Sequence, residues 1–400
     1  MRRKMMIWKA IWLLVATICL FTLMLYQNSS ADTKVNGGVA GLTTAENHNN
    51  NEAFQKILNE PHKGMLKIYI PKGTYWFRGG PIKLASNTIM QFADGAAFKA
   101  RDGESVTFAY PSSSAGYNGG VKNITWNNAS FIGGNSNKGQ SSFVQSLNHA
   151  VNINFNENYF YNCENPKGHY LDIDGSHDVH VRDSTFVGFN AAKGYEYKEA
   201  IQVDYSNRVT MSYELPGDKY DNLPTYDISV TGSKFLPLIQ QGKIKYYAPN
   251  PIGQHNTYLN GKYGVIHNVR FTDNIVTDAF PFTSDNEATI NFNGVSHIRI
   301  ANNRFANMLV HGGTNYIRIN NSLSTYKMKD INVVDNLFYN IDVFNADILI
   351  ESRDSDNNIQ KVNISNNKMI SGDHNGKMVI KKNVQSAYIK NNILMDTLSN

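Results

Sequence analysis

Cysteine is almost missing from this 400-residue sequence and occurs only at Cys19 and Cys163. Because Cys19 lies in the apolar N-terminal segment described below, a chain without that segment has one cysteine and no intrachain disulfide. The sequence also has no P-loop, no zinc-type spacing of Cys and His, and no Gly-x-Ser-x-Gly motif. These absences exclude a disulfide-stapled scaffold, and no cofactor is predicted from a motif.

The N-terminus has the three-part layout of an export signal. Three cations open the chain, an apolar run with one interruption covers residues 5–26, and small residues at 29–31 offer a cleavage site. This layout predicts a signal peptide over 1–31. An uncleaved membrane anchor over 5–26 is the alternative, because about 20 apolar residues suffice to span a bilayer. Both interpretations place the remainder of the protein in a secreted or extracellular location.

The remainder of the chain has little net charge. The whole chain has a formal net charge of +5, and removal of the four cations in residues 1–31 leaves +1. Proteins that bind nucleic acid need a basic face. We therefore expect no nucleic-acid partner, and membrane contact only through an uncleaved N-terminal segment. The sequence leaves the oligomeric state open.

Helical periodicity is scarce, and one short pattern recurs in its place. The pattern is apolar-x-apolar-x-polar-Asn-like-x-apolar, which describes a short strand, a polar corner and an inward side chain. Nine segments end on such an apolar residue, at positions 131, 160, 186, 235, 276, 305, 338, 369 and 394. Spacings of 25 to 49 residues are typical of a β-solenoid in which each repeat forms one coil. The pattern predicts a single all-β domain over 32–400.

The N-terminal part of this domain carries a resemblance. Residues 50–60 (NNEAFQKILNE) are expected to form a short amphipathic helix, followed by YIPKGTYW, IKLASNTIMQF, DGAAF and then the V-x-I-x-N-x-x-F coils. This order resembles the right-handed parallel β-helix proteins of the pectin-lyase-like superfamily, over roughly residues 40–400. The resemblance implies a single-stranded right-handed parallel β-helix whose open end is covered by the N-terminal helix. It also implies a carbohydrate-active function, since most members are hydrolases, lyases, epimerases or depolymerases.

Stacking the coils about 4.8 Å apart predicts two columns of outward side chains. Counting back from the closing apolar residues places LDIDG (171–175) and INFNG (290–294) at the same position of their coils, and apolar alternation places 201–204 and 252–255 between them. The first column is Ser146, Asp172, Gln202, Gly253, Asn291 and Arg318, and the second is Asn148, Asp174, Asp204, His255, Asn293 and Asn320.

Three carboxylates meet in these columns. Asp172 and Asp174 are neighbours on one face of a strand, about 6.6 Å apart, and Asp204 is expected beside Asp174 on the next coil. Close like charges resist joint ionisation, so we expect a raised pKa at one acid or a bound cation. The alternative is an ordinary polar outer face.

The two longest repeat spacings, 49 and 41 residues, predict large loops over 205–226 and 236–250 beside the acidic column. Long loops on a rigid scaffold often carry function. These loops are rich in Tyr and contain a few cations, which suits a groove for a sugar polymer, including an acidic one. The substrate-binding candidates near the column are His169, Lys198, Glu199, Gln202, Tyr205, Arg208, Asn291, Asn293 and Arg318.

Glycoside hydrolysis is the predicted chemistry. It needs one acid to protonate the leaving oxygen and a second group to activate water or attack the sugar. The catalytic candidates are Asp172, Asp174, Asp204 and His255. The arrangement loosely resembles polygalacturonase-type hydrolases at Asp174-Gly175, Asp204, His255 and Arg318-Ile319-Asn320. Asn320 stands where that family has a lysine for a uronate, so galacturonan is not the expected substrate.

Two other functions fit the same residues. A polysaccharide lyase or uronate epimerase would bind Ca²⁺ through Asp172, Asp174 and Asp204 as oxygen ligands. Its base would be one of Lys198, Arg208, His255 and Arg318. A non-catalytic surface protein would instead bind glycan along the tyrosine-rich loops. The hydrolase, which needs no metal, is the favoured hypothesis.

Overall fold

The computed structural model describes residues 31–134, 143–163, 169–190, 199–254, 262–323, 325–352, 359–371 and 376–395. The predicted signal or anchor over 5–26 lies outside these residues, as do Lys198 and His255. Within the described ranges, no helix is long and apolar enough to cross a membrane.

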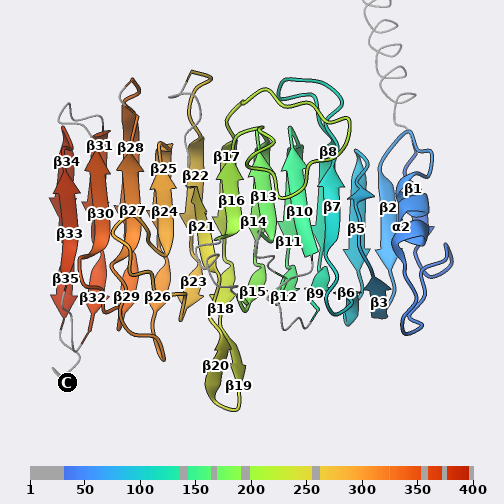
Figure 1. Ribbon diagram of the computed structural model, residues 1–400, viewed down its shortest axis with the longest axis horizontal. Helices are drawn as coiled ribbons and strands as arrows, with labels where there is room; N and C mark the ends of the chain where they lie inside the picture. The colour runs from blue at the N-terminus through green and yellow to red at the C-terminus, as the bar shows by residue number, and fades with distance from the viewer. Residues whose placement is uncertain are drawn as a thin grey trace, which may run out of the picture.

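Three long parallel sheets run side by side along the molecule, and each central coil adds one strand to each sheet (Figure 1). In the described residues the sheets have ten, twelve and eleven strands, which a coil visits in that order. The ten-strand sheet contains β4 (Ile82–Lys83), β7 (Val106–Tyr110), β10 (Phe143–Asn148), β13 (Leu171–Asp174), β16 (Glu199–Asp204), β21 (Asn250–Gln254), β24 (Ile290–Asn293), β27 (Asn315–Asn321), β30 (Ala346–Ser352) and β33 (Lys377–Lys382).

The other two sheets form the rest of the wall. The twelve-strand sheet contains β1 (Thr33–Asn36), β2 (Leu66–Ile70), β5 (Thr88–Phe92), β8 (Lys122–Asn127), β11 (Val151–Asn156), β14 (His177–Arg182), β17 (Tyr226–Thr231), β22 (His267–Thr272), β25 (Ser296–Ala301), β28 (Met328–Val334), β31 (Ile359–Ser365) and β34 (Ala387–Lys390). The eleven-strand sheet contains β3 (Gly73–Phe77), β6 (Ala96–Ala100), β9 (Ser130–Ile132), β12 (Tyr159–Tyr161), β15 (Thr185–Val187), β18 (Lys234–Leu236), β23 (Ile275–Thr277), β26 (Arg304–Ala306), β29 (Leu337–Tyr339), β32 (Lys368–Ile370) and β35 (Ile393–Met395).

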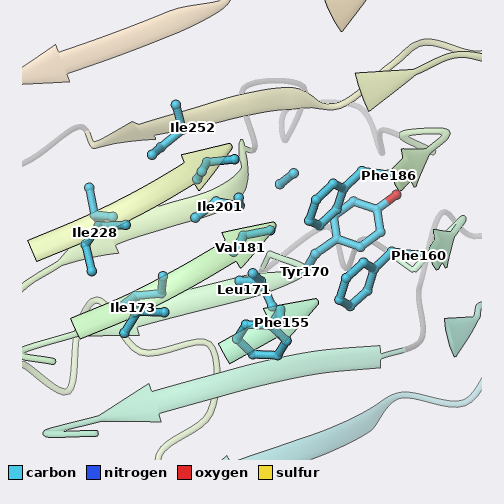
Figure 2. Packing of buried hydrophobic residues seen from close by; sticks show 14 of the residues in the cluster. Phe155, Phe160, Tyr170, Leu171, Ile173, Val181, Phe186, Ile201, Ile228 and Ile252 are labelled. Atoms are coloured by element: carbon cyan, nitrogen blue, oxygen red, sulfur yellow. The ribbon is translucent and has the colours of Figure 1, made fainter. Parts of the chain in front are cut away.

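The closing apolar residues of the repeat stack inside the solenoid, as the pattern predicts. The rings of Phe160 and Phe186 are parallel with centroids 4.7 Å apart, and Phe235 continues the stack at 4.8 Å from Phe186. Figure 2 shows Tyr170 packed edge-on against Phe160 and Phe186. The wall strands alternate in the same way, so that Val181 stacks on Val230 in the interior. Equivalent residues of successive coils therefore build one continuous core.

The polar corners have two structural roles. One corner residue of each coil adopts a left-handed backbone, for example Asn302 with φ 56° and Asp335 with φ 58°, a conformation that Asn and Asp tolerate best after glycine. The next residue turns its side chain inward. Asn274, Asn303 and Asn336 form a buried ladder in which each side-chain oxygen accepts the backbone N–H of the preceding coil's residue. The ladder satisfies backbone groups that the corner leaves without a sheet partner.

The predicted capping helix is present as α2 (Asn51–Leu58). Its apolar face buries Phe54, Ile57 and Leu58 at the N-terminal end of the solenoid. The Phe54 ring contacts the rings of Phe98 at 5.1 Å and Phe77 at 6.1 Å, both edge-on. The helix therefore covers the aromatic interior of the first coils.

The prediction of a loop over 236–250 is wrong. This segment forms an antiparallel hairpin of β19 (Leu238–Gln240) and β20 (Lys243–Tyr246). The turn residues Gln241 and Gly242 both have positive φ, 51° and 72°, as a tight two-residue hairpin turn requires. The insertion over 205–226, in contrast, forms no strand before Tyr226, where β17 begins.

Candidate active site: a buried carboxylate cluster

Asp172, Asp174 and Asp204 lie together, and we call them the carboxylate cluster. Strand β13 pairs in parallel with β16, so that Asp174 lies opposite Asp204 and Asp172 lies opposite Gln202. The intervening Ile173 is buried in the hydrophobic core, and strand alternation therefore places the acids on the outer side of the coil. This is the register that the apolar alternation of the two segments predicts.

The pairing continues along both predicted columns. In the first column, Ser146 lies opposite Asp172, Gln202 opposite Gly253, Gly253 opposite Asn291, and Asn291 opposite Arg318. In the second column, Asn148 lies opposite Asp174 and Asn293 opposite Asn320. The place expected for His255 between Asp204 and Asn293 lies outside the described residues.

The three outward carboxylates are nevertheless shielded from solvent, because all three are 0% exposed. The segment after β16 folds back over them, and we call residues 205–223 the strap (Figure 1). The Thr210 hydroxyl donates to Oδ1 of Asp174 at 2.8 Å, and the backbone N–H of Ser212 donates to Oδ2 of Asp172. Strand periodicity places side chains inside or outside a coil, but it carries no information on where a long insertion comes to rest.

The far end of the strap is fastened to neighbouring coils. Asp218 Oδ1 accepts the backbone N–H of Ser112 at 3.0 Å. Asp221 accepts the N–H of Gly116 at 2.6 Å and lies 2.9 Å from Nε2 of the buried His149. Sequence reasoning missed these anchors, because a contact between insertions about 70 to 100 residues apart leaves no periodic signal.

The cluster combines two kinds of carboxyl group. Burial, followed by the charges of Asp172 and Asp204, raises the pKa of Asp174 well above its ordinary value. The Asp172 side chain beside Asp174 adds to this rise. Asp204 instead accepts N–H donors at both oxygens, from Gln202 Nε2 and from the backbone of Tyr205, each at 2.8 Å. An acid with a raised pKa thus adjoins a carboxyl group whose two oxygens both accept N–H donors.

The cluster does not fit a calcium ion. Ca²⁺ takes about six to eight oxygen ligands, whereas both Asp204 oxygens accept N–H donors, and one oxygen each of Asp172 and Asp174 accepts a strap donor. No group of three or more His, Cys, Asp or Glu in the described part of the chain is arranged to hold a metal. We therefore derive no step through calcium.

His169 and Glu199 form a second buried contact at the start of the two acidic strands. Nδ1 of His169 lies 2.6 Å from the backbone oxygen of Glu199 and 3.8 Å from its Oε2. Gly253, on the next strand, provides room for this carboxylate, because a Cβ there would lie 2.7 Å from Glu199 Oε1. These residues adjoin the cluster along β13 and β16 but contact one another.

Two predicted substrate-binding residues of the strap region are engaged elsewhere. Tyr205 belongs to the hydrophobic core and is 1% exposed, because it continues the inward alternation of Ile201 and Val203. Arg208 is exposed on the strap, where it pairs with Glu214 at 3.4 Å and lies over the ring of Tyr220. Both side chains are thus engaged away from the carboxylates, although the backbone N–H of Tyr205 donates to Asp204.

Arg318 and its neighbours form a separate network. Both Nε and Nη2 of Arg318 contact Glu351 Oε1 at 2.8 Å, and its Nη1 contacts the Asn286 carbonyl and Asn291 Oδ1. Asn293 Oδ1 accepts from the side chain of Asn320 at 3.1 Å. Arg318 is buried in these contacts, and its role in substrate binding stays a prediction.

Comparison with known proteins gives structural likenesses alone. No family model matches the sequence, and a search of curated proteins finds no match. PfbA, a surface adhesin of Streptococcus pneumoniae, superposes with a TM-score of 0.62 at 16% identity, over 90% of both chains. A tailspike protein of E. coli bacteriophage HK620, in complex with a pentasaccharide, gives a TM-score of 0.55 at 10% identity, over 92% of this chain and 64% of the other. Such identities show the fold, and the chain is a right-handed parallel β-helix, as the resemblance noted in its sequence implies.

Proposed function

We propose that the protein is an exported polysaccharide-degrading enzyme, a glycoside hydrolase in which Asp174 is the general acid. The observation that carries this proposal is the burial of Asp172, Asp174 and Asp204 against one another. Removing several acids from water costs several kcal/mol each. Acids whose burial is costly and whose pKa values are perturbed concentrate at functional sites.

The two kinds of carboxyl group suit the two roles in glycoside cleavage. Asp174, with its raised pKa, retains a proton that it can donate to the glycosidic oxygen. Asp204, whose two oxygens accept N–H donors, activates water or attacks the sugar. Its place on the adjacent strand, about 4.8 Å away, approaches the retaining spacing of about 5–5.5 Å.

Substrate reaches the carboxylate cluster only after the strap moves, because the strap removes all three acids from solvent. The strap contains no regular strand or helix, and such segments move more readily than sheet strands. The likeness to a surface adhesin supports an extracellular location, and the likeness to a tailspike bound to a pentasaccharide supports a glycan partner.

The test is activity on a panel of neutral and acidic polysaccharides, with and without EDTA. Reducing ends and the ultraviolet absorbance of unsaturated products are followed together. We expect reducing ends without ultraviolet gain, no effect of EDTA, and loss of activity in Asp174→Asn. Ultraviolet gain would overturn hydrolysis in favour of a lyase.

A non-catalytic glycan-binding protein is the second candidate. The complete burial of the carboxylate cluster favours it, since a catalytic acid must touch the bond that it cleaves. In that case the cluster anchors the strap and has no further role. Glycan binding without product release across the whole panel would select this function.

A further inference from the structure

The β19–β20 hairpin stands out from the solenoid wall at the lower edge of Figure 1, with a groove on each side. The first groove, of about 350 Å³, lies between the hairpin and the eleven-strand sheet. It is lined in part by Lys99, Tyr161, Gln240 and Lys245. The second groove, of about 520 Å³, includes Lys243, Lys245, Tyr247 and His311.

The charge of both grooves has one sign. Lys243 and Lys245 are exposed on β20, and Lys245 contributes to both grooves. Among the described residues that line the two grooves, none is an Asp or a Glu. The whole sequence has 38 Lys and Arg against 33 Asp and Glu, so this imbalance is a local feature.

The cations lie beside aromatic rings. Nζ of Lys99 lies 4.5 Å from the centre of the Trp76 ring, and Nζ of Lys245 lies 5.3 Å from that of Tyr246. Such contacts restrict where an ammonium group points. Tyr161 and Tyr247 add amphipathic rings of the kind that pack on the faces of polar ligands.

The base of the hairpin is fixed to the solenoid. Phe189 and Tyr247 form an antiparallel bridge, and Ala248 bridges to Ala279. Gly188 has φ +79°, and a Cβ there would lie 3.1 Å from Cβ of Leu238, so the glycine lets β19 approach closely. The grooves are therefore held by the scaffold rather than by a free loop.

We propose that the hairpin and its two grooves bind an acidic polysaccharide, at a site separate from the carboxylate cluster. Uronate carboxylates would accept charge-assisted hydrogen bonds from Lys99, Lys243 and Lys245. The choice of a polysaccharide over other polyanions rests on the function proposed above. The hairpin leads directly into β21, and Asn250 of β21 lies opposite Glu199 of β16. A polymer bound at the hairpin would therefore lie beside the sheet that carries the carboxylate cluster.

The experiment measures the affinity of the full chain for alginate and polygalacturonate, with dextran as the neutral polymer. The variant Lys243→Gln/Lys245→Gln should bind both uronate polymers about tenfold more weakly, and Lys99→Gln should weaken binding to a smaller extent. Wild-type binding should fall as salt is raised. The matched control is Lys381→Gln/Lys390→Gln, which removes two exposed lysines of the last coils and should bind like wild type.

Unchanged affinity in both hairpin variants would overturn the proposal, as would an equal loss in the control. Dextran bound as tightly as the uronates, or duplex DNA bound more tightly than either, would also overturn it. The same measurements are made with Asp174→Asn. If Asp174→Asn still binds the uronate polymers but releases no product, the hairpin site and the catalytic site are separate. If wild type binds the polymers but shows no activity on any polysaccharide, the proposed hydrolysis is rejected and the hairpin site stands.

Discussion

The hydroxyl of Thr210 donates a 2.8 Å hydrogen bond to Oδ1 of Asp174, and so joins the strap to the strand beneath it. This contact opposes the rise in the Asp174 pKa, because a donor favours the charged carboxylate. The strap also contacts the cluster through the backbone N–H of Ser212 on Asp172 and that of Tyr205 on Asp204. The position of the strap and the protonation of the cluster are therefore linked.

Thr210→Val should loosen the strap. The substitution keeps the shape of the side chain and removes donation to Asp174, leaving a buried acceptor short of a donor at a cost of about 1–3 kcal/mol. We expect amide hydrogen exchange over residues 206–222 to accelerate by about tenfold or more. Thr231→Val is the control, because Thr231 lies on β17, outside the strap, with its hydroxyl 3.5 Å from that of Thr272. Equal exchange in the two variants would contradict a tethering role.

Asp174→Asn should change how stability depends on pH. The native pKa of Asp174 is raised above the value of about 3.9 in an unfolded chain, so the native state holds the proton more tightly. The resulting stabilisation is full below about pH 3.9 and is lost as pH rises through the native pKa.

Urea unfolding measures this effect. Relative to Asp174→Asn, wild type should lose free energy of unfolding as pH is raised from about 4 toward neutrality. Asp102→Asn, which replaces an exposed aspartate, should show the same dependence of stability on pH as wild type. A difference between wild type and Asp174→Asn that stays constant with pH would refute the raised pKa.

Asp174→Asn and Asp204→Asn should each abolish most of the hydrolysis expected under the proposed function. Loss of a positioned acid or base costs about 10²–10⁴-fold in rate. Asn keeps the size of the side chain, and folding is checked by circular dichroism. Asp102→Asn again serves as the control for a change of one charge. Turnover within a few-fold of wild type in either cluster variant would exclude that residue from catalysis.

The repeat predicted the coil register because stacking makes the spacing visible in the sequence. Counting back from Phe186 and Phe305 placed Gly175 and Gly294 at one corner of their coils, and both have a left-handed backbone, with φ 50° and 75°. Apolar alternation, rather than the count, placed Asp204 beside Asp174, and the two residues pair directly. Periodicity was sufficient because parallel stacking forces equivalent residues into line.

The strap and the hairpin could not be predicted in the same way. Their contacts involve insertions that have no counterpart in other coils, such as Asp221 of the strap with His149 at 72 residues' separation. Arg318 also has a non-periodic partner, since Glu351 lies opposite Asn320 rather than opposite Arg318. The sequence therefore located the carboxylates but left open whether solvent reaches them.

Asn303→Ala should destabilise the scaffold that aligns the acidic strands. Asn303 is 2% exposed, donates from Nδ2 to the Phe271 carbonyl and to Asn336 Oδ1, both at 2.9 Å, and accepts the Asn274 backbone N–H through Oδ1 at 2.9 Å. Alanine leaves that buried N–H and carbonyl without their partners, at about 1–3 kcal/mol each. The free energy of unfolding in urea should fall by about 2–5 kcal/mol.

Asn332→Ala is the matched control, because Asn332 is half-buried on the outer side of β28 and should cost less than about 1 kcal/mol. If the two variants lost equal stability, the buried ladder would stabilise the protein no more than an outward amide does. A selective loss at Asn303 would mean that the inward amides of the corners fix the stacking of the coils from Asn274 to Asn336.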